Sequence, residues 1–102
     1  MHARLVAISG PLEGATFLIE GELSVGRDRQ NTLAIEDRVL SRRHCAIQDT
    51  DGKCCLRDLG SSNGTYVNGL PVTSRILNDG DQITAGQSLF LFASSTATSR
   101  WR

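Results

Sequence analysis

Three short polar clusters contain the side chains of this sequence that could do chemistry. They are GRD at residues 26–28, SRRH at 41–44 and SSNG at 61–64. An arginine guanidinium is a permanent cation with several hydrogen-bond donors, and hydroxyl and amide groups add further donors. These residue types favour the binding of an oxygen-rich ligand over the burial of apolar surface.

The third cluster belongs to the stretch from Leu56 to Gly69, LRDLGSSNGTYVNG, in which a short apolar run gives way to a polar loop and then to a strand. Two Asn-Gly pairs, at residues 63–64 and 68–69, flank the strand-like residues 65–67. Asn-Gly favours the left-handed backbone conformations that tight turns require. We therefore expect a rigid loop here, at the functional end of the protein.

Short extended segments separated by turn residues make up the rest of the chain, and no helical periodicity is sustained. The expected strands are residues 4–9, 15–19, 23–25, 33–35, about 42–49, 53–58, 65–67, 70–72, 75–77, 82–84 and 88–93. Pro71 places its segment at a sheet edge, and the continuous apolarity of residues 88–93 predicts a strand buried on both faces. Many short strands with Gly-rich turns predict an all-β sandwich or barrel with loops gathered at its two ends.

The overall composition excludes several classes of protein. The 102 residues suffice for a single core, and 11 Lys and Arg balance 11 Asp and Glu. A neutral chain lacks the broad basic surface of a nucleic-acid or membrane binder. No window approaches the roughly 18 apolar residues that span a bilayer, and the N-terminus lacks a signal-peptide core. We expect a soluble, cytoplasmic protein with no direct contact to nucleic acid or membrane.

The three cysteines, Cys45, Cys54 and Cys55, are odd in number and lack the spacing of metal ligands. Neighbouring residues on a strand point to opposite faces, so Cys54 and Cys55 cannot both face one metal ion. We expect ordinary small core or near-surface residues, no disulfide framework, no metal site and no cofactor.

From residue 94 the sequence becomes SSTATSRWR, which has the composition of a linker. We therefore expect a folded domain over residues 1–93. Residues 94–102 are expected to form a Ser/Thr-rich tail or a linker to a further domain of a larger protein.

The three polar clusters, taken in order, resemble the motifs of the forkhead-associated (FHA) domain. That family has a Gly-Arg after an early strand, a Ser-Arg-x-His at a middle strand and a Gly-Ser-x-Asn-Gly-Thr-x-x-Asn-Gly loop. The matching segments here are GR at 26–27, SRRH at 41–44 and GSSNGTYVNG at 60–69. The resemblance extends from about Leu5 to Phe92, which is most of the chain.

The resemblance implies an all-β sandwich of about eleven short strands whose loops at one end bind phosphothreonine peptides. It assigns contact with the phosphopeptide to Arg27, Ser41, Arg42, Ser62 and Asn63. It assigns a structural role in the site to Gly26, His44, Gly64, Asn68 and Gly69.

These residue types agree with that ligand. Phosphothreonine carries a charge of about −1.5 to −2 and three strong acceptor oxygens, so its site needs a permanent cation and several donors. The expected partner is a phosphothreonine-containing protein or peptide, in signalling or transcription regulation alongside Ser/Thr kinases. Peptide preference depends on the loop residues 28–30 and 37–39, whose mixed charges indicate no clear motif.

Two other functions compete with this interpretation. Ser41, His44 and Asp58 are the residue types of a hydrolytic triad, but the chain has no Gly-x-Ser-x-Gly elbow, and residues 41 and 44 on one strand would point to opposite faces. We therefore do not expect an enzyme. The second alternative is an FHA-like interaction or assembly domain that does not depend on phosphate.

Overall fold

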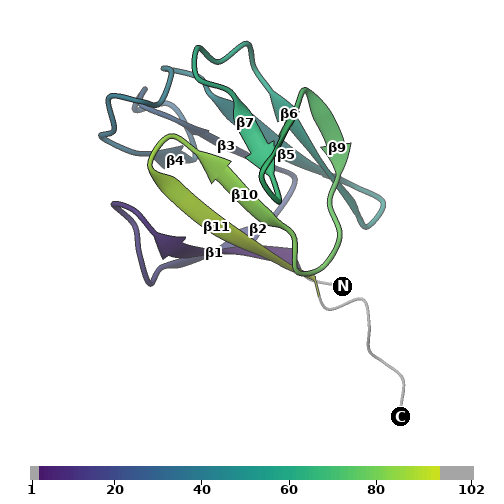
Figure 1. The fold of residues 1–102 in the computed structure, drawn as a ribbon. Helices are drawn as coiled ribbons and strands as arrows, with labels where there is room; N and C mark the ends of the chain where they lie inside the picture. Colours follow the sequence, from purple (N-terminus) through teal and green to yellow (C-terminus); the bar gives the residue numbers. More distant parts are fainter. Residues whose placement is uncertain (1–2, 95–102) are drawn as a thin grey trace.

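The computed structural model describes residues 3–94, which form two β-sheets packed face to face (Figure 1). The eleven strands of this part of the chain are β1 (Ala3–Ser9), β2 (Thr16–Ile19), β3 (Glu22–Gly26), β4 (Leu33–Ala34), β5 (Cys45–Thr50), β6 (Lys53–Asp58), β7 (Thr65–Val67), β8 (Leu70–Val72), β9 (Ser74–Ile76), β10 (Gln82–Ala85) and β11 (Ser88–Ser94). The predicted all-β sandwich is confirmed. Residues 95–102 of the expected tail lie outside the described residues.

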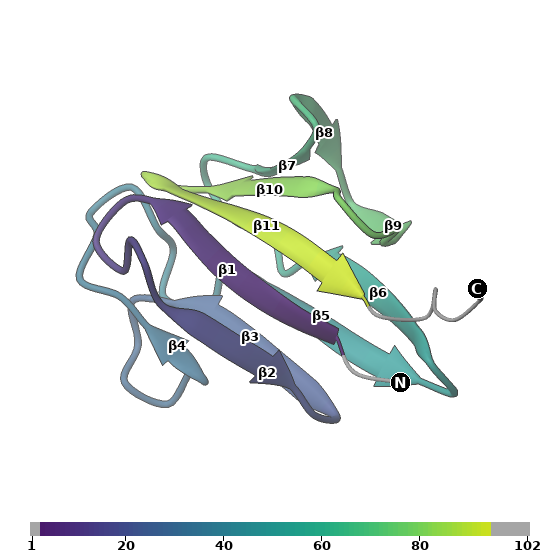
Figure 2. The same cartoon turned by 90° about the horizontal axis from the view of Figure 1, so that it is seen from below.

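One sheet has the strand order β2-β1-β11-β10-β7-β8 and the other has the order β4-β3-β5-β6-β9. Neighbouring strands are antiparallel except for the parallel pair β3 and β4. The first and last strands, β1 and β11, run side by side, with Ala3 opposite Ser94 (Figure 2). Pro71 lies in the edge strand β8, as predicted.

The core lies between the sheets and follows the alternation of side chains along each strand. Leu5, Leu23, Ile47, Leu56 and Phe90 are fully buried there, and each contributes about 1.5–3 kcal/mol of transfer free energy. None of the residues described here forms a helix that could span a membrane.

The last strand, β11, differs from the prediction that both of its faces are buried. Ser88, Phe90 and Phe92 face the core, whereas Leu89 and Leu91 are only half-buried. The outer side of this sheet is covered by no second layer in the described residues, so the outward side chains rely on their strand neighbours for shielding.

The three cysteines are free thiols, and Cys45 and Cys54 are buried small residues, as predicted. Burial raises the pKa of the Cys45 thiol to about 12, and the nearby Asp58 carboxylate adds to the rise while a hydrogen bond with Thr65 opposes it. Cys45 is therefore a neutral core residue at physiological pH.

The middle strand β5 begins at Cys45, three residues later than the predicted start near Arg42. Residues 41 and 42 turn toward the end of β3 instead: the Ser41 carbonyl accepts from the Arg27 N–H at 3.0 Å, and the Arg42 carbonyl accepts from the Asp28 N–H at 3.1 Å. The SRRH motif therefore lies in a loop that is hydrogen-bonded to the neighbouring loop.

Strand register brings three loops to one end of the sandwich. Val25 near the end of β3 pairs with Cys45 at the start of β5, and Cys45 pairs with Asp58 at the end of β6. The loops 27–32, 35–44 and 59–64 consequently meet at the upper left of Figure 1. These are the loops that contain the three polar clusters.

Candidate functional site

The three loops enclose a hollow of about 250 Å³ at this end of the molecule. It contains all five residues that the sequence assigned to ligand contact. The lining residues are Arg27, Arg38, Val39, Leu40, Ser41, Arg42, Ser62 and Asn63. The predicted contact residues thus converge although they come from three separate parts of the chain.

Arg27 is held in place by the loop opposite. Its side-chain Nε donates to the Leu40 carbonyl at 2.7 Å, and its main-chain N–H donates to the Ser41 carbonyl at 3.0 Å. The guanidinium is therefore oriented before any ligand arrives, and its two terminal nitrogens can still donate. Planar, paired donors of this kind match the oxygens of a phosphate.

At the hollow, two hydrogen bonds connect the 59–64 loop to the 35–44 loop. The Ser62 N–H donates to Ser41 Oγ at 2.9 Å, and Asn63 Nδ2 donates to the Val39 carbonyl at 2.9 Å. Because Ser41 Oγ accepts one hydrogen bond, its own O–H can donate to a ligand. The Asn63 side chain is exposed and keeps its Oδ1 as an acceptor for a peptide N–H.

His44 lies beneath the hollow and joins the same two loops from below. Its side chain is 0% exposed. Nδ1 accepts from the Ser41 N–H at 3.1 Å, and Nε2 lies 2.8 Å from the Gly64 carbonyl. These contacts select the tautomer with the proton on Nε2. His44 therefore positions both loops without lining the hollow.

Gly26 permits the close approach of two site loops. A Cβ at this position would collide with the Arg42 carbonyl and would lie 2.7 Å from Asn31 Nδ2. That amide nitrogen donates to the Arg42 carbonyl at 2.7 Å and to the Asp28 carbonyl at 2.8 Å. The glycine is needed here for space rather than for an unusual backbone angle.

Asp58 organises the 60–64 loop. Its carboxylate accepts from the Gly60 and Ser61 N–H groups at 3.1 Å each, from Ser61 Oγ at 2.5 Å and from Thr65 Oγ1 at 2.7 Å. Partial burial raises the pKa of this carboxyl, but the hydrogen bonds outweigh burial and hold the pKa below the ordinary aspartate value. The charged form of Asp58 therefore stabilises the loop.

The two Asn-Gly pairs differ in structure. In the pair at 63–64 only Gly64 has a positive φ, of 88°, so this segment is an open loop. Asn68 and Gly69 have φ values of 52° and 84° and form the β7–β8 hairpin turn. The Asn68 side chain bonds Asp81 and the Gln82 N–H, both at 3.0 Å, so this pair supports a different turn and lies outside the hollow.

Sequence reasoning missed Asp58 as part of the site, gave Ser61 no role of its own within the third cluster, and did not anticipate the carbonyls of Val39 and Leu40. An aspartate shortly before Gly and Ser is a known signal for side-chain capping of a turn, and it could have indicated Asp58. Main-chain carbonyls have no such signal, because every residue has one.

The argument that Ser41 and His44 point to opposite faces of one strand was wrong, because neither residue is in a strand. The two residues are in contact, but through the Ser41 main chain. Ser41 Oγ bonds the Ser62 N–H, and Asp58 bonds residues of its own loop. Ser41, His44 and Asp58 therefore do not form the hydrogen-bonded series of a catalytic triad.

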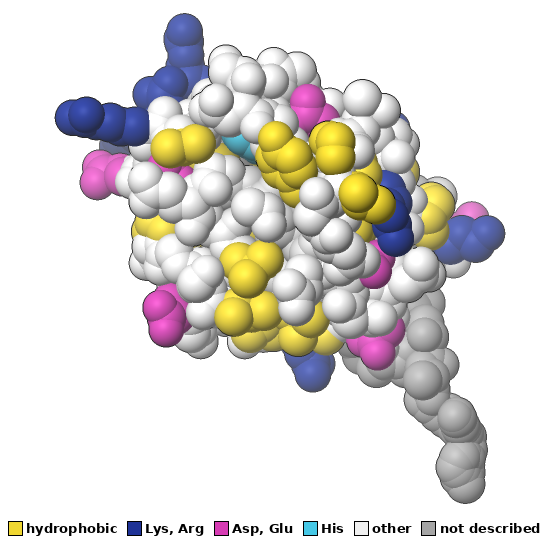
Figure 3. All heavy atoms as spheres, viewed as in Figure 1, with side chains coloured by type: hydrophobic (Ala, Val, Ile, Leu, Met, Phe, Trp, Pro, Cys, Tyr) yellow, Lys and Arg dark blue, Asp and Glu magenta, His cyan; other side chains and the backbone are white. Residues whose placement is uncertain are grey.

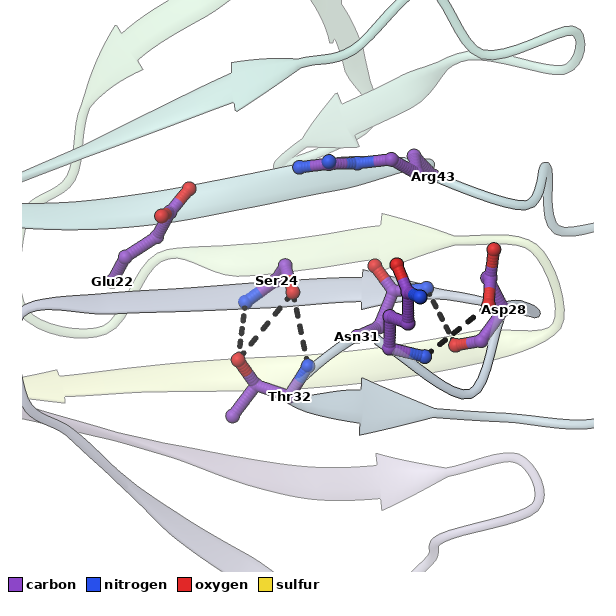
Figure 4. A pocket seen from close by; sticks show the side chains of 7 residues that line it. Glu22, Ser24, Asp28, Asn31, Thr32 and Arg43 are labelled. Carbon is purple, nitrogen blue, oxygen red and sulfur yellow. Dashed lines mark hydrogen bonds between the residues drawn. The ribbon is translucent and has the colours of Figure 1, made fainter.

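A second polar hollow, of about 270 Å³, lies on the other side of the 27–32 loop (Figure 4). Its lining residues are Glu22, Ser24, Asp28, Gln30, Asn31, Thr32 and Arg43. Ser24 and Thr32 hydrogen-bond each other here through their main-chain N–H groups and hydroxyls. Arg43 thus faces away from its neighbour Arg42.

The chain also resembles known proteins. Residues 23–86 match the family model of the FHA domain. The chain belongs to the FHA family. Among curated proteins, it is 36% identical over 96 residues to the oxoglutarate dehydrogenase inhibitor of Corynebacterium efficiens. It is 37% identical over 91 residues to the glycogen accumulation regulator GarA of Mycolicibacterium smegmatis. These matches cover 93% and 88% of this chain but only 68% and 58% of the two relatives.

Solved FHA domains have the same fold. One, from a study of phosphothreonine-dependent FHA domain interactions, has a TM-score of 0.84 and 34% identity, over 92% of this chain and 97% of that chain. Another, the FhaA FHA domain in complex with the intracellular domain of Rv3910, has a TM-score of 0.79 and 36% identity, over 88% and 98% of the two chains.

Proposed function

We propose that this FHA domain is a non-catalytic module that binds phosphothreonine in partner proteins. The observation that carries the proposal is the hollow in which Arg27 and Arg42 lie together with Ser41 and Ser62, with no carboxylate side chain among its lining residues. Two guanidiniums balance a phosphate charge of about −1.5 to −2, and the hydroxyls and main-chain groups supply further donors.

Each predicted contact residue has a role in this proposal. Arg27 binds phosphate oxygens through its terminal nitrogens, and Arg42 adds a second guanidinium at the rim. Ser41 and Ser62 donate their hydroxyl protons to the phosphate. Asn63 bonds the peptide main chain beside the phosphothreonine, since its amide both donates and accepts.

The relatives support a regulatory setting. They are named as an enzyme inhibitor and as a regulator of glycogen accumulation, and one related structure concerns phosphothreonine-dependent interactions. The domain accordingly acts by phosphorylation-dependent protein association within Ser/Thr kinase signalling, as part of a longer protein. The three free thiols fit a cytoplasmic location, where thiols remain reduced.

The test is an oriented phosphothreonine peptide library, followed by calorimetry with one selected peptide in phosphothreonine, phosphoserine and unmodified threonine forms. We expect micromolar affinity, about −8 kcal/mol, for the phosphothreonine form and no measurable binding of the threonine form. Equal affinity for the phosphothreonine and threonine forms would refute the proposal and favour a phosphate-independent assembly domain.

A further inference from the structure

The hollow contains more positive charge than one phosphate requires. Arg27, Arg38 and Arg42 all line it, and no acidic side chain does. Within residues 3–94 the recorded salt bridge joins Arg75 and Asp81 at 3.9 Å, so none of these three arginines is paired with a carboxylate. In Figure 3, Lys and Arg side chains project together at the upper left, where the site loops lie in Figure 1.

Asp37 precedes Arg38 in the chain but does not neutralise it. The Asp37 side chain is buried, with 5% exposure, and its two oxygens accept from the Val39 N–H at 2.9 Å and the Gln87 N–H at 2.8 Å. Gly86 allows this approach, because a Cβ there would lie 2.5 Å from the Asp37 carboxylate. Asp37 therefore connects the 35–44 loop to the β10–β11 turn. The side chain of this pair that lines the hollow is Arg38.

Asp28 is likewise directed away from the ligand. It lines the hollow of Figure 4 together with Arg43, and its Oδ1 accepts from the Gln30 N–H at 3.2 Å. The opposite charges within residues 28–30 and 37–39 therefore lie in different places: the Asp28 and Asp37 carboxylates bond main-chain N–H groups, whereas Arg38 lines the hollow. Of these six residues, Arg38 is the charged one that lines the hollow containing Arg27 and Arg42.

Arg38 also borders a second hollow next to the first. Arg27 and Arg38 line a neighbouring, more open hollow of about 370 Å³ as well, together with Glu36 and Asp37. Ser62 and Asn63 line only the first hollow. Arg38 therefore lies where the two hollows meet, and the exposed Glu36 carboxylate lines the second one.

We propose that the ligand carries a second anionic group close to the phosphothreonine, an acidic side chain or a second phosphate, and that Arg38 binds it. This inference rests on the proposed function. Arg27 and Arg42 already match the charge of one phosphate, and Arg38 forms no ion pair within residues 3–94, so it can bind a further anion of the peptide. A complementary anion relieves the repulsion among the three guanidiniums and gives sequence preference around the phosphothreonine.

The experiment uses phosphothreonine peptides in a neutral Ala and Gly background, in which aspartate or phosphoserine is placed at each flanking position in turn. Affinities are measured for the wild-type chain, Arg38→Ala and Arg43→Ala. Arg43→Ala removes the same charge from the same end of the molecule but from the hollow of Figure 4. Comparison of the aspartate and phosphoserine arms tells which anion is preferred.

At one or more positions we expect the acidic peptide to bind the wild type about tenfold more tightly than the neutral peptide. Arg38→Ala should abolish that advantage, so that acidic and neutral peptides bind this variant equally well, while Arg43→Ala should preserve it. Glu36→Gln should increase the advantage, because it removes the one exposed carboxylate beside Arg38.

Two results overturn the inference. One is equal affinity of acidic and neutral phosphothreonine peptides at every position, and the other is an acidic preference that survives in Arg38→Ala. If the neutral phosphothreonine peptide binds in either case, the proposed function stands and only the second anion is refuted. If no phosphothreonine peptide binds better than its unmodified form, both proposals fail.

Discussion

Arg27 shows how a single side chain can be prepared for its ligand. An exposed arginine normally samples many rotamers, and ordering it on binding reduces affinity. Here the Nε hydrogen bond to the Leu40 carbonyl already orders the side chain in the unbound protein. The remaining donors can therefore bind a phosphate with less loss of conformational entropy.

Substitution of Arg27 separates charge from geometry. We expect Arg27→Ala to lose about 2–4 kcal/mol of phosphopeptide affinity, because it leaves the bound phosphate without its main partner. Arg27→Lys should lose less, since it retains the charge, but it cannot keep both the Leu40 contact and paired donors. Calorimetry measures these losses. Arg57→Ala, an exposed arginine of β6, is the control, and an Arg27→Ala affinity equal to that of the control would contradict the assignment.

Asp58 makes the stability of the 60–64 loop depend on pH. Its folded pKa is lowered, so the stabilisation by its carboxylate is present above the ordinary aspartate pKa and is lost as pH falls through the lowered folded value. At neutral pH we expect the free energy of unfolding of Asp58→Asn to be about 1–2 kcal/mol lower than that of the wild type. The difference in unfolding free energy between the two proteins should become smaller in acid, where the Asp58 carboxylate of the wild type becomes protonated.

Denaturant unfolding from neutral to acidic pH measures this effect. Asp51→Asn, in the exposed β5–β6 turn, is the matched control and should follow the wild type. A difference between Asp58→Asn and wild type that is constant across the pH range would show that the carboxylate charge does not hold the loop.

At the scale of elements, the loops are positioned by strand register and by contacts between loops. The pairing of Val25, Cys45 and Asp58 across β3, β5 and β6 brings three loop bases together. Hydrogen bonds from Asp28, Asn31 and Ser62 then connect the loops to one another. A change that separates two loops should therefore weaken ligand binding even where it touches no ligand-contact side chain.

Gly26→Ala tests that dependence. The new Cβ displaces the Arg42 carbonyl, which accepts hydrogen bonds from the Asp28 N–H and from Asn31 Nδ2. We therefore expect the free energy of unfolding to fall by about 2–3 kcal/mol and phosphopeptide binding to weaken. Gly60→Ala is the control: Gly60 has a φ of 79° with open space around it, and the cost should be conformational, about 1 kcal/mol. Thermal unfolding compares the two, and a smaller loss for Gly26→Ala than for Gly60→Ala would contradict the steric argument.

The strands could be predicted where turn residues mark their ends. Residues 53–58 follow the Asp51-Gly52 turn, and residues 65–67 lie between two Asn-Gly pairs, and both strands have the predicted bounds. The start of β5 could not be predicted, because residues 41–44 bond other loops, and such tertiary contacts override local extended propensity.

At the scale of the whole molecule, the sequence motifs predicted which side chains converge but not which charges face the ligand. Asp37 and Arg38 are adjacent in sequence, and only the structure shows that Asp37 bonds the β10–β11 turn while Arg38 lines the hollow. A net charge of zero likewise conceals the concentration of arginines at one end. Charge balance is a property of the chain, whereas binding depends on where the charges lie.

The central claim is that this end of the sandwich binds a peptide because the peptide is phosphorylated. Its most direct test is an amide NMR titration of the chain with one peptide in phosphothreonine and unmodified threonine forms. We expect the phosphothreonine form to shift amide signals of residues 27–31, 38–42 and 60–64, and the threonine form to shift none. Equal shifts with both forms, or shifts confined to the outer faces of the sheets, would contradict the account.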